Sequence, residues 1–324
     1  MDNNQYNRPE DSSKEWKLIE KALMASQKEQ RTARRWGIFF KILTFSYLFI
    51  IVALIYGGPK KGGDSGAFAM GPHAAVVEVR GPISAEDEAS ADRIIGAMRE
   101  AFENEDALGL ILRINSPGGS PVQSGYVFDE IIRLKATRPD FPVYAVIMDI
   151  GASGAYYIAA AADEIYADKA SLVGSIGVIG SGFGFVDAMD KLGVERRLYT
   201  SGEHKAFLDP FSPQREEEKE FWEGVLDVTH QQFISQVKLG RGDRLADDPD
   251  LFSGLVWTGE QALELGLIDG LGSSSQVARD MLGTDELTNY TMQKDPFVEF
   301  MERFGTSFGK GVASFFSTQT MVMR

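Results

Sequence analysis

The stretch Val143-Tyr-Ala-Val-Ile-Met-Asp-Ile-Gly-Ala-Ser-Gly-Ala-Tyr-Tyr-Ile158 joins a β-prone run to a helix-prone one through small residues around Ser153. A strand that enters a tight turn before a helix would expose the serine hydroxyl, and the helix end would offer free N–H groups to an anion. The pattern therefore predicts a nucleophilic serine at this turn. A turn with a purely structural role is the alternative. It is not the Gly-x-Ser-x-Gly elbow, because Ala155 stands in place of the second glycine.

Strand-like and helix-like segments alternate on both sides of this stretch. Repeated alternation predicts an α/β fold, with a mainly parallel sheet covered by helices. We expect a helix and a short closing strand within 257–272. The other expected strands are 74–79, 108–114, 143–148, 164–167, 173–179 and 195–199, and the other expected helices are 88–102, 121–135, 155–162, 183–192 and 213–239.

Composition excludes several classes of function. The chain of 324 residues contains no cysteine, so disulfides, thiol catalysis and thiolate metal sites are excluded. It contains three histidines, whose neighbourhoods do not suggest a metal site, and we expect no cofactor. The formal net charge is −14, and because residues 1–41 carry an excess of three basic residues, the remainder carries −17. Such an acidic body argues against nucleic acid as a partner.

An apolar run from Trp36 to Tyr56 is close to the ~20 residues that a helix needs to cross a bilayer. Lys41 is its only charged residue and lies near one end, where a lysine can reach the interface. More Lys and Arg residues precede the run than follow it, so the N-terminus is expected in the cytoplasm and the large domain outside it. A cleaved signal peptide and a buried core helix are the alternatives.

These patterns predict the organisation of the whole chain. A cytoplasmic tail over 1–35 precedes the transmembrane helix over 36–56, and a linker over 57–73 leads to the main domain over 74–285. The C-terminal segment over 286–324 is amphipathic and rich in phenylalanine. It could pack on the domain, on a partner or on a membrane surface.

A nucleophilic serine needs a base, and the sequence offers two adjacent candidates. His73 lies in the predicted linker and His230 in a helical run, so His204 is the remaining histidine, with Lys205 beside it. On a strand, adjacent side chains point to opposite faces, so only one of the two would face a given site. A lysine can act as a base where an apolar setting favours its neutral form, and residues 206–208 are consistent with such a setting.

The stretch Asn115-Ser-Pro-Gly-Gly119 follows a predicted buried strand. Its two consecutive glycines leave backbone N–H groups unshielded, which an oxyanion hole requires. A plain turn before a helix is the alternative. A phosphate-binding loop is disfavoured because no Gly-Lys-Ser/Thr ending follows.

Five blocks resemble the short, signal peptide peptidase A-like form of the S49 family of membrane-anchored serine proteases. They occur in the family's order between about Ala74 and Gly272, and together they are specific although each alone is weak. The blocks are Leu112-Arg-Ile-Asn-Ser-Pro-Gly-Gly119, Gly151-Ala-Ser-Gly-Ala-Tyr-Tyr157, Gly174-Ser-Ile-Gly-Val178, Ser201-Gly-Glu-His-Lys-Ala-Phe-Leu-Asp-Pro210 and Trp257-Thr-Gly-Glu-Gln-Ala-Leu-Glu-Leu-Gly-Leu-Ile-Asp-Gly-Leu-Gly272.

The resemblance implies a ClpP/crotonase-like fold and a role for each matching residue. Ser153 would be the nucleophile and Lys205 the general base, while the N–H groups of Gly119 and Gly154 would form the oxyanion hole. Ser175 would lie close enough to orient Lys205, and His204 would have no catalytic role. No metal or cofactor is implied.

The resemblance also implies a setting for the reaction. Family members form rings or domes and degrade signal peptides and other apolar peptides from the bacterial cell (inner) membrane, with the catalytic domain on the periplasmic or extracytoplasmic side. In such a homo-oligomer the pair of Ser153 and Lys205 could form within one protomer or across two.

Two other readings stay open at this point. The crotonase fold also hosts acyl-CoA enzymes, although the Ser-Gly pair at 153–154 and the lysine favour the protease. A membrane-anchored scaffold would need no nucleophile at all, and it predicts that Ser153→Ala leaves the biological role intact.

Overall fold

The computed structural model describes residues 34–49 and 71–292, with five isolated positions before residue 34. The chain divides into one compact unit of Met1–Lys61 with Asp295–Arg324 and a second of Gly62–Lys294. In the first unit, residues 34–49 are helical and exposed, and Trp36 packs edge-on against Phe39 with ring centroids 5.7 Å apart. Within the described residues, no helix has both the length and the apolar character needed to span a bilayer. The second part of the predicted span, 50–56, and positions 293–324 lie outside the described residues.

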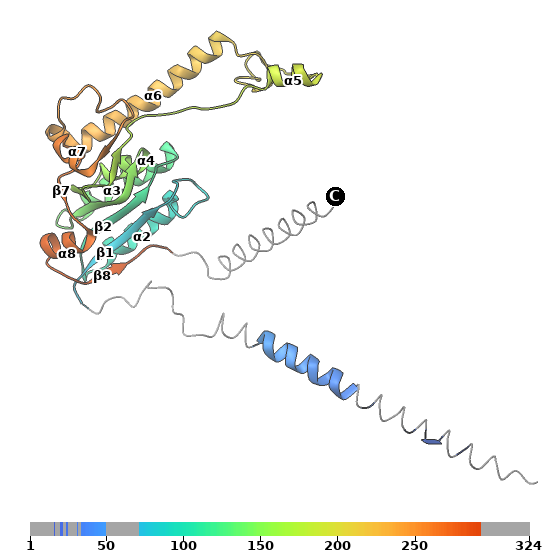
Figure 1. Ribbon diagram of the computed structural model, residues 1–324. Coiled ribbons are helices and arrows are strands. Elements are labelled where there is room, and N and C mark those ends of the chain that lie inside the picture. The colour runs from blue at the N-terminus through green and yellow to red at the C-terminus, as the bar shows by residue number, and fades with distance from the viewer. Residues whose placement is uncertain are drawn as a thin grey trace, which may run out of the picture. The chain divides into compact units, whose positions relative to one another are not determined.

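The second unit is built on a sheet of eight strands (Figure 1). Its main path runs in the order β6-β5-β3-β2-β1-β8, with β4 beside β3 and β7 beside β4. All pairs are parallel except β5 with β6, so the predicted mainly parallel α/β fold is confirmed. The strands are β1 (His73–Arg80), β2 (Ala107–Ser116), β3 (Val143–Ala152), β4 (Glu164–Ala167), β5 (Leu172–Gly174), β6 (Val256–Thr258), β7 (Gly270–Leu271) and β8 (Leu287–Asn289).

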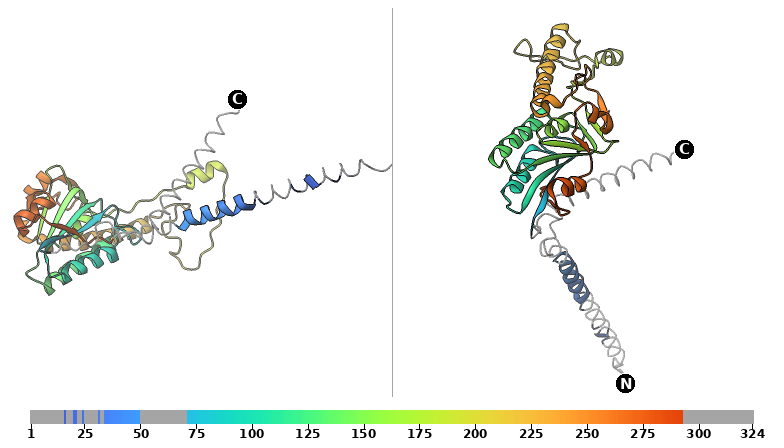
Figure 2. Two further views of the ribbon diagram at one scale, coloured as in Figure 1. Left: turned by 90° about the horizontal axis from the view of Figure 1, so that it is seen from below. Right: turned by 90° about the vertical axis from the view of Figure 1, so that its left-hand side faces the viewer.

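Helices cover both faces of this sheet, which is why its central strands are almost continuously apolar (Figure 2). The larger buried cluster contains alternate residues such as Val77, Leu112 and Ala145, and it packs against α2 (Ala91–Glu103), α3 (Pro121–Thr137) and α4 (Gly154–Ala159). The intervening residues, such as Ile111 and Tyr144, pack against α8 (Ser274–Leu282). The period of two along each strand thus divides the core into two layers.

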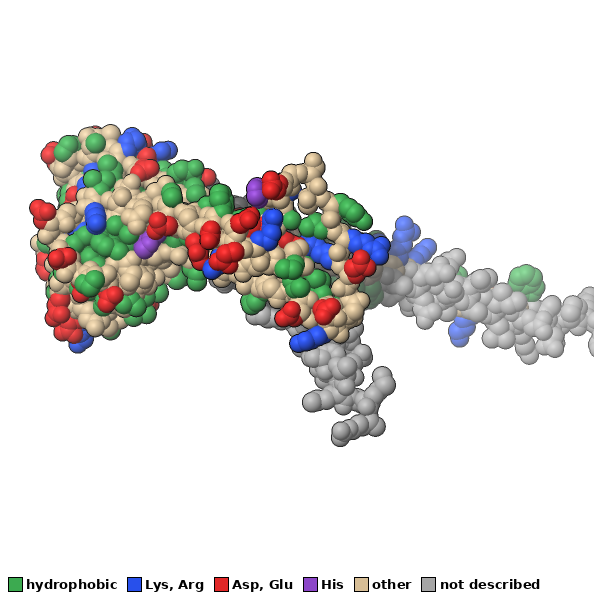
Figure 3. All heavy atoms as spheres, turned by 90° about the horizontal axis from the view of Figure 1, so that it is seen from above, with side chains coloured by type: hydrophobic (Ala, Val, Ile, Leu, Met, Phe, Trp, Pro, Cys, Tyr) green, Lys and Arg blue, Asp and Glu red, His purple; other side chains and the backbone are tan. Residues whose placement is uncertain are grey.

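The segment from 177 to 215, here called the arm, leaves the sheet after β5 and contains α5 (Val186–Leu192). It leads into α6 (Glu216–Arg241), whose first half projects with α5 away from the sheet (Figure 1). The arm buries little apolar surface within the chain. Its exposed large apolar side chains are Ile179, Phe183, Phe185, Leu192, Val194, Leu198, Tyr199 and Phe211. Figure 3 shows hydrophobic side chains lying among charged ones on one face of the molecule.

The last turn of α6 packs tightly against the sheet domain at the end of α4. Gly240 lies so close to the carbonyl oxygen of Ala160 that no Cβ would fit between them. Arg241 is only 1% exposed, and its guanidinium forms two hydrogen bonds with Asp269, at 2.6 and 3.0 Å. It also donates twice to the carbonyl oxygen of Gly266, at 3.0 and 2.8 Å. After this turn follow a short 3-10 helix, Gly242–Arg244, and α7 (Gly259–Glu264).

Several expected elements differ from the structure. The expected strand over 195–199 is wrong, because this stretch of the arm has no regular structure and no neighbouring strand to pair with. The expected strand over 173–179 ends at Gly174, since Ser175 has a φ of +50°, which ends the extended conformation. The helix expected over 183–192 begins only at Val186. Neither α8 nor β8 was expected, and β8 adds a strand beside β1 beyond residue 285.

His73 was expected in the linker but is the first residue of β1 and is fully buried. Its ring stacks on Tyr290, and its Nε2 lies 2.8 Å from the Tyr290 hydroxyl. This contact joins the start of the sheet domain to the residue that follows β8.

Candidate active site

Ser153 lies at the turn between β3 and α4, as the N-cap residue of that helix. It has φ +55° and ψ −125°, a conformation that costs a residue with a side chain roughly 1–3 kcal/mol. The turn is held by the Ser153 N–H, which donates to the Gly174 carbonyl at 2.8 Å, and by the Ser153 carbonyl, which accepts from the Tyr157 N–H at 3.0 Å. The side chain is half-buried, so the strained turn presents a hydroxyl at the surface of the sheet edge.

Two glycines from the loop after β2 lie directly against this turn. Gly118 has φ +94°, and a Cβ built on it would lie 2.7 Å from the Ala152 carbonyl oxygen, the Gly154 nitrogen and the Ser153 Cβ. Gly119 has φ +154° and packs against the backbone of Ile83. Only glycine fits at these positions, because Gly118 meets the serine turn and Gly119 meets the backbone of Ile83.

The backbone nitrogens of Gly119 and Gly154 lie in the same small region. A Cβ built on Gly154 would lie 3.3 Å from the Gly119 nitrogen. Gly154 is the first residue of α4, where N–H groups have no partner within the helix. In the part of the chain that the structure describes, the Gly119 N–H has no hydrogen-bond partner either. Two such donors beside a serine hydroxyl are the arrangement that stabilises a tetrahedral oxyanion.

Ser175 belongs to the same region. It follows Gly174, the residue whose carbonyl accepts from Ser153, and its own N–H donates to the Leu255 carbonyl at 2.7 Å. Its φ of +50° makes it one of three non-glycine residues at positive φ in the described chain, with Ser153 and Leu208. The structure therefore brings together four of the five predicted site residues.

Lys205, the fifth, lies on the distal part of the arm. Ile176, just before the arm, meets α6 at His230, whose Nε2 lies 3.0 Å from the Ile176 carbonyl oxygen. The distal part packs Phe207 against Trp222, with ring centroids 6.1 Å apart. Trp222 and His230 are about 12 Å apart along the helix axis, at ~1.5 Å per residue. Lys205 is exposed, as is His204, and among the described residues neither side chain forms a hydrogen bond with Ser153.

The loop that bears Lys205 is ordered by charge. Arg196 forms an ion pair with Asp209, and its guanidinium lies 5.0 Å from the centre of the Phe211 ring. Hydrogen bonds from Arg196 and then from Ser212 lower the pKa of Asp209 to about 2. The segment from 206 to 209 is therefore held in place and half-buried, while Lys205 beside it is exposed.

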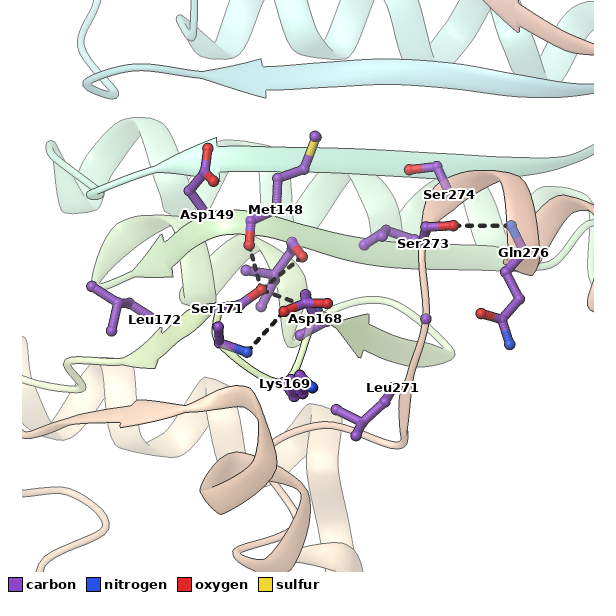
Figure 4. A pocket seen from close by; sticks show the side chains of 15 residues that line it. Met148, Asp149, Asp168, Lys169, Ser171, Leu172, Leu271, Ser273, Ser274 and Gln276 are labelled. Carbon is purple, nitrogen blue, oxygen red and sulfur yellow. Dashed lines mark hydrogen bonds between the residues drawn. The ribbon is translucent and has the colours of Figure 1, made fainter.

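A separate pocket of about 830 Å³ is lined by the middle of β3, by the segment 167–172 and by residues within 271–276 (Figure 4). Met148 and Asp149 line it from β3, and Ser273 and Gln276 line it from the start of α8. None of the predicted site residues lines it. Within the described residues, no group of three or more His, Cys, Asp or Glu side chains could hold a metal ion.

Ile83 is a site residue that sequence reasoning missed. Its N–H donates to the Gly118 carbonyl at 2.9 Å, and its carbonyl accepts from the Ser120 N–H at 2.8 Å. This one-residue parallel bridge fixes the loop that carries Gly119. No sequence signal could have identified it, because Ile83 contributes only its backbone.

A mainly parallel α/β domain with a strained serine beside two free N–H donors suits a serine-type peptidase, and the comparison with known proteins shows that class. Residues 135–287 match peptidase family S49. A putative protease of Synechocystis is 32% identical over 212 residues, which are 64% of this chain and 74% of that protein. The chain belongs to peptidase family S49.

Two further relatives are matched over smaller shares of their length. A putative signal peptide peptidase SppA of Enterococcus faecium is 33% identical over 196 residues, 60% of this chain and 56% of that protein. A protein of Brucella abortus named Na(+)/H(+) antiporter NhaA is 46% identical over 188 residues, 58% of this chain and 25% of that protein. The chain thus spans only a quarter to about half of these two relatives.

Proposed function

We propose that the chain is a membrane-anchored serine endopeptidase that cleaves remnant signal peptides and other apolar peptides by acyl transfer. The observation that carries this proposal is the convergence of Ser153, held at positive φ, with the free N–H groups of Gly119 and Gly154. The substrate class is supported by the similarity to a relative named putative signal peptide peptidase. The finer fold assignment, ClpP/crotonase-like, belongs to the same proposal.

The proposed reaction uses a dyad of Ser153 and Lys205. The neutral Lys205 amine takes the proton from Ser153 Oγ as the oxygen attacks a peptide carbonyl carbon. The Gly119 and Gly154 N–H groups stabilise the resulting oxyanion. Its collapse breaks the C–N bond, and the leaving amine takes the proton from Lys205. A water molecule, deprotonated by Lys205, then hydrolyses the acyl-enzyme, and Ser175 orients the lysine throughout.

The position of Lys205 favours a dyad that forms between two copies of the chain. Lys205 is exposed in the single chain, whereas a lysine is best suited to act as a base where an apolar surface covers it. The arm carries Lys205 away from its own Ser153 and exposes apolar side chains such as Phe183 and Leu192. A homo-oligomer, arranged as a ring or dome, would cover these side chains and bring each Lys205 to a neighbour's serine.

The membrane part of the proposal rests on the apolar run over 36–56. Its described part is helical, and every residue of it is exposed, including Phe40 and Leu43. We propose a single-pass protein with its N-terminus in the cytoplasm and its catalytic domain on the extracytoplasmic side. Added protease should then digest the domain from spheroplasts but leave residues 1–35 intact, and the reverse pattern would reject this orientation.

The catalytic proposal is tested with a quenched apolar peptide that resembles a signal-peptide core. The wild type should cleave it, Ser153→Ala and Lys205→Ala should not, and His204→Ala should remain active. An active Lys205→Ala with an inactive His204→Ala would transfer the role of base to the histidine. An inactive but folded and assembled wild type would favour the scaffold reading instead.

The dyad between copies is tested by mixing Ser153→Ala and Lys205→Ala chains, each inactive alone. In a closed ring of randomly mixed subunits at equal amounts, about a quarter of the sites receive one intact serine and one intact lysine. Mixing should therefore restore roughly a quarter of the wild-type activity. If differently tagged chains exchange but no activity returns, the dyad forms within one chain.

A further inference from the structure

We propose that Ser116 is a positioning residue that holds the Gly119 N–H toward the oxyanion. The inference rests on the proposed function and extends it to a residue with no contact to substrate. Ser116 is the last residue of β2 and is fully buried. It pairs with Gly151 of β3, two residues before Ser153, so it lies beneath the site.

The hydroxyl of Ser116 closes a small turn around Pro117. Its Oγ accepts the N–H of Gly118 at 3.1 Å, in a buried position. A serine hydroxyl that accepts from the second residue after it replaces a backbone turn, and the proline between them has a fixed φ. Among the described residues, the Ser116 Oγ is therefore the only side-chain atom that accepts a hydrogen bond from the Gly118 N–H.

The other end of Gly118 is held by Ile83. The Gly118 carbonyl accepts from the Ile83 N–H at 2.9 Å. In a trans peptide the C=O and the next N–H point in opposite directions, so the Gly119 N–H must point away from Ile83. The Gly119 nitrogen also lies close to Gly154, whose built Cβ would be 3.3 Å from it. Ser116 and Ile83 thus fix the peptide that supplies the oxyanion donor.

Loss of the hydroxyl would leave the Gly118 N–H buried without an acceptor, an unfavourable state that rotation of the peptide would relieve. Gly118 has no side chain to oppose this rotation, and the Gly118–Gly119 peptide would turn with it. Substrate contacts made elsewhere would not change. Ser116 should therefore act on the transition state and not on substrate affinity.

The test compares the full-length wild type with Ser116→Ala on the quenched apolar peptide. Removal of one oxyanion donor lowers kcat by about 10²–10³-fold, so a displaced donor should lower it by roughly 10-fold or more. KM should stay within about twofold of the wild type, because ground-state binding is untouched. A peptide boronate, whose tetrahedral adduct places an oxygen in the oxyanion hole, should lose affinity by the same factor as kcat/KM.

Ser171→Ala is the matched control. Ser171 is 2% exposed, and its Oγ accepts the Asp168 N–H at 3.0 Å and donates to the Met148 carbonyl, but it lies beside the separate pocket (Figure 4). It should retain the wild-type kcat although it loses a comparable buried hydroxyl. A loss of kcat in Ser171→Ala equal to that in Ser116→Ala would assign both effects to general destabilisation and overturn the proposal.

Ser153→Ala separates the failure of this inference from that of the proposed function. If Ser153→Ala keeps wild-type turnover, the serine is not the nucleophile and both proposals fall. If Ser153→Ala is inactive but Ser116→Ala keeps kcat and boronate affinity within twofold of the wild type, the function stands and the role of Ser116 is refuted.

Discussion

Replacement of Arg241 by leucine should destabilise the sheet domain more than any comparable change at its surface. Arg241 is 1% exposed and forms a bidentate ion pair with Asp269, whose side chain is 16% exposed. Burial alone would raise the pKa of Asp269, but hydrogen bonds from Arg241 and from the Ile165 N–H lower it overall. Arg241→Leu therefore leaves a buried, charged carboxylate without its main partner.

The expected loss follows from the groups left behind. Removal of one partner from a buried ion pair costs about 3–5 kcal/mol, and Asp269 keeps Arg244 at 3.1 Å, so the lower end applies. The Gly266 carbonyl loses both of its Arg241 donors, which adds about 1 kcal/mol or more. The total of about 4 kcal/mol corresponds to a fall in Tm of roughly 8–16 °C for a domain of this size.

Thermal unfolding followed by circular dichroism at pH 7 measures this fall. Arg244→Leu is the control, because Arg244 contacts the same carboxylate but its side chain is 39% exposed. Its cost should be smaller than that of Arg241→Leu, because the half-exposed Arg244 contributes one longer contact to the carboxylate, although it also donates to the carbonyls of Arg241, Asp163 and Gly240. If Arg241→Leu lowers Tm by less than about 3 °C, or by no more than Arg244→Leu, the buried pair does not anchor α6 as argued.

Two further predictions concern acid and the glycine loop. Hydrogen bonds, first of all from Arg133, lower the pKa of Glu130 from 4.5 to about 2. The contribution of ionised Glu130 to stability is therefore complete above pH 4.5 and is lost as the pH falls toward 2. Urea unfolding should show that the difference in stability between wild type and Glu130→Gln closes over this pH range, and a constant difference would contradict the assignment. Gly118→Ala should abolish labelling of Ser153 by a fluorophosphonate, because the new Cβ would clash with the serine turn. Gly81→Ala should keep the labelling, since Gly81 has φ +75° but open space around it, and equal losses in both would point to backbone strain alone.

The central strands could be predicted from the sequence because burial on both faces gives continuous apolar runs. The expected strand 108–114 lies within β2, and 143–148 lies within β3, which continues to Ala152. The continuation was missed because β3 has an irregular register before Gly151, where apolar periodicity gives no signal. The strand expected over 195–199 failed for another reason. Its residues have a strand-like pattern, but they form no strand because no neighbouring strand is available to pair with them.

The helix α8 carried signals that could have been used. Ser273 accepts the Gln276 N–H as an N-cap, and Gly283 ends the helix in the left-handed conformation. The clustering of Gly119, Ser153 and Gly154 was predictable, because both loops follow the carboxyl ends of neighbouring parallel strands. The position of Lys205 could not be predicted, because the number of residues between Ser153 and Lys205 does not reveal that the arm leaves the sheet.

The backbone conformation at Ser153 and Ser175 favours glycine, so these two positions would tend to change to glycine if selection on the serines were lifted. Both residues hold positive φ, where glycine is relaxed and serine is strained by roughly 1–3 kcal/mol. A single substitution to glycine at either position would therefore make the domain more stable while removing the hydroxyl. Mutational drift would favour a better-folded chain without these hydroxyls, so the strain at both positions must be offset by any function that the hydroxyls serve.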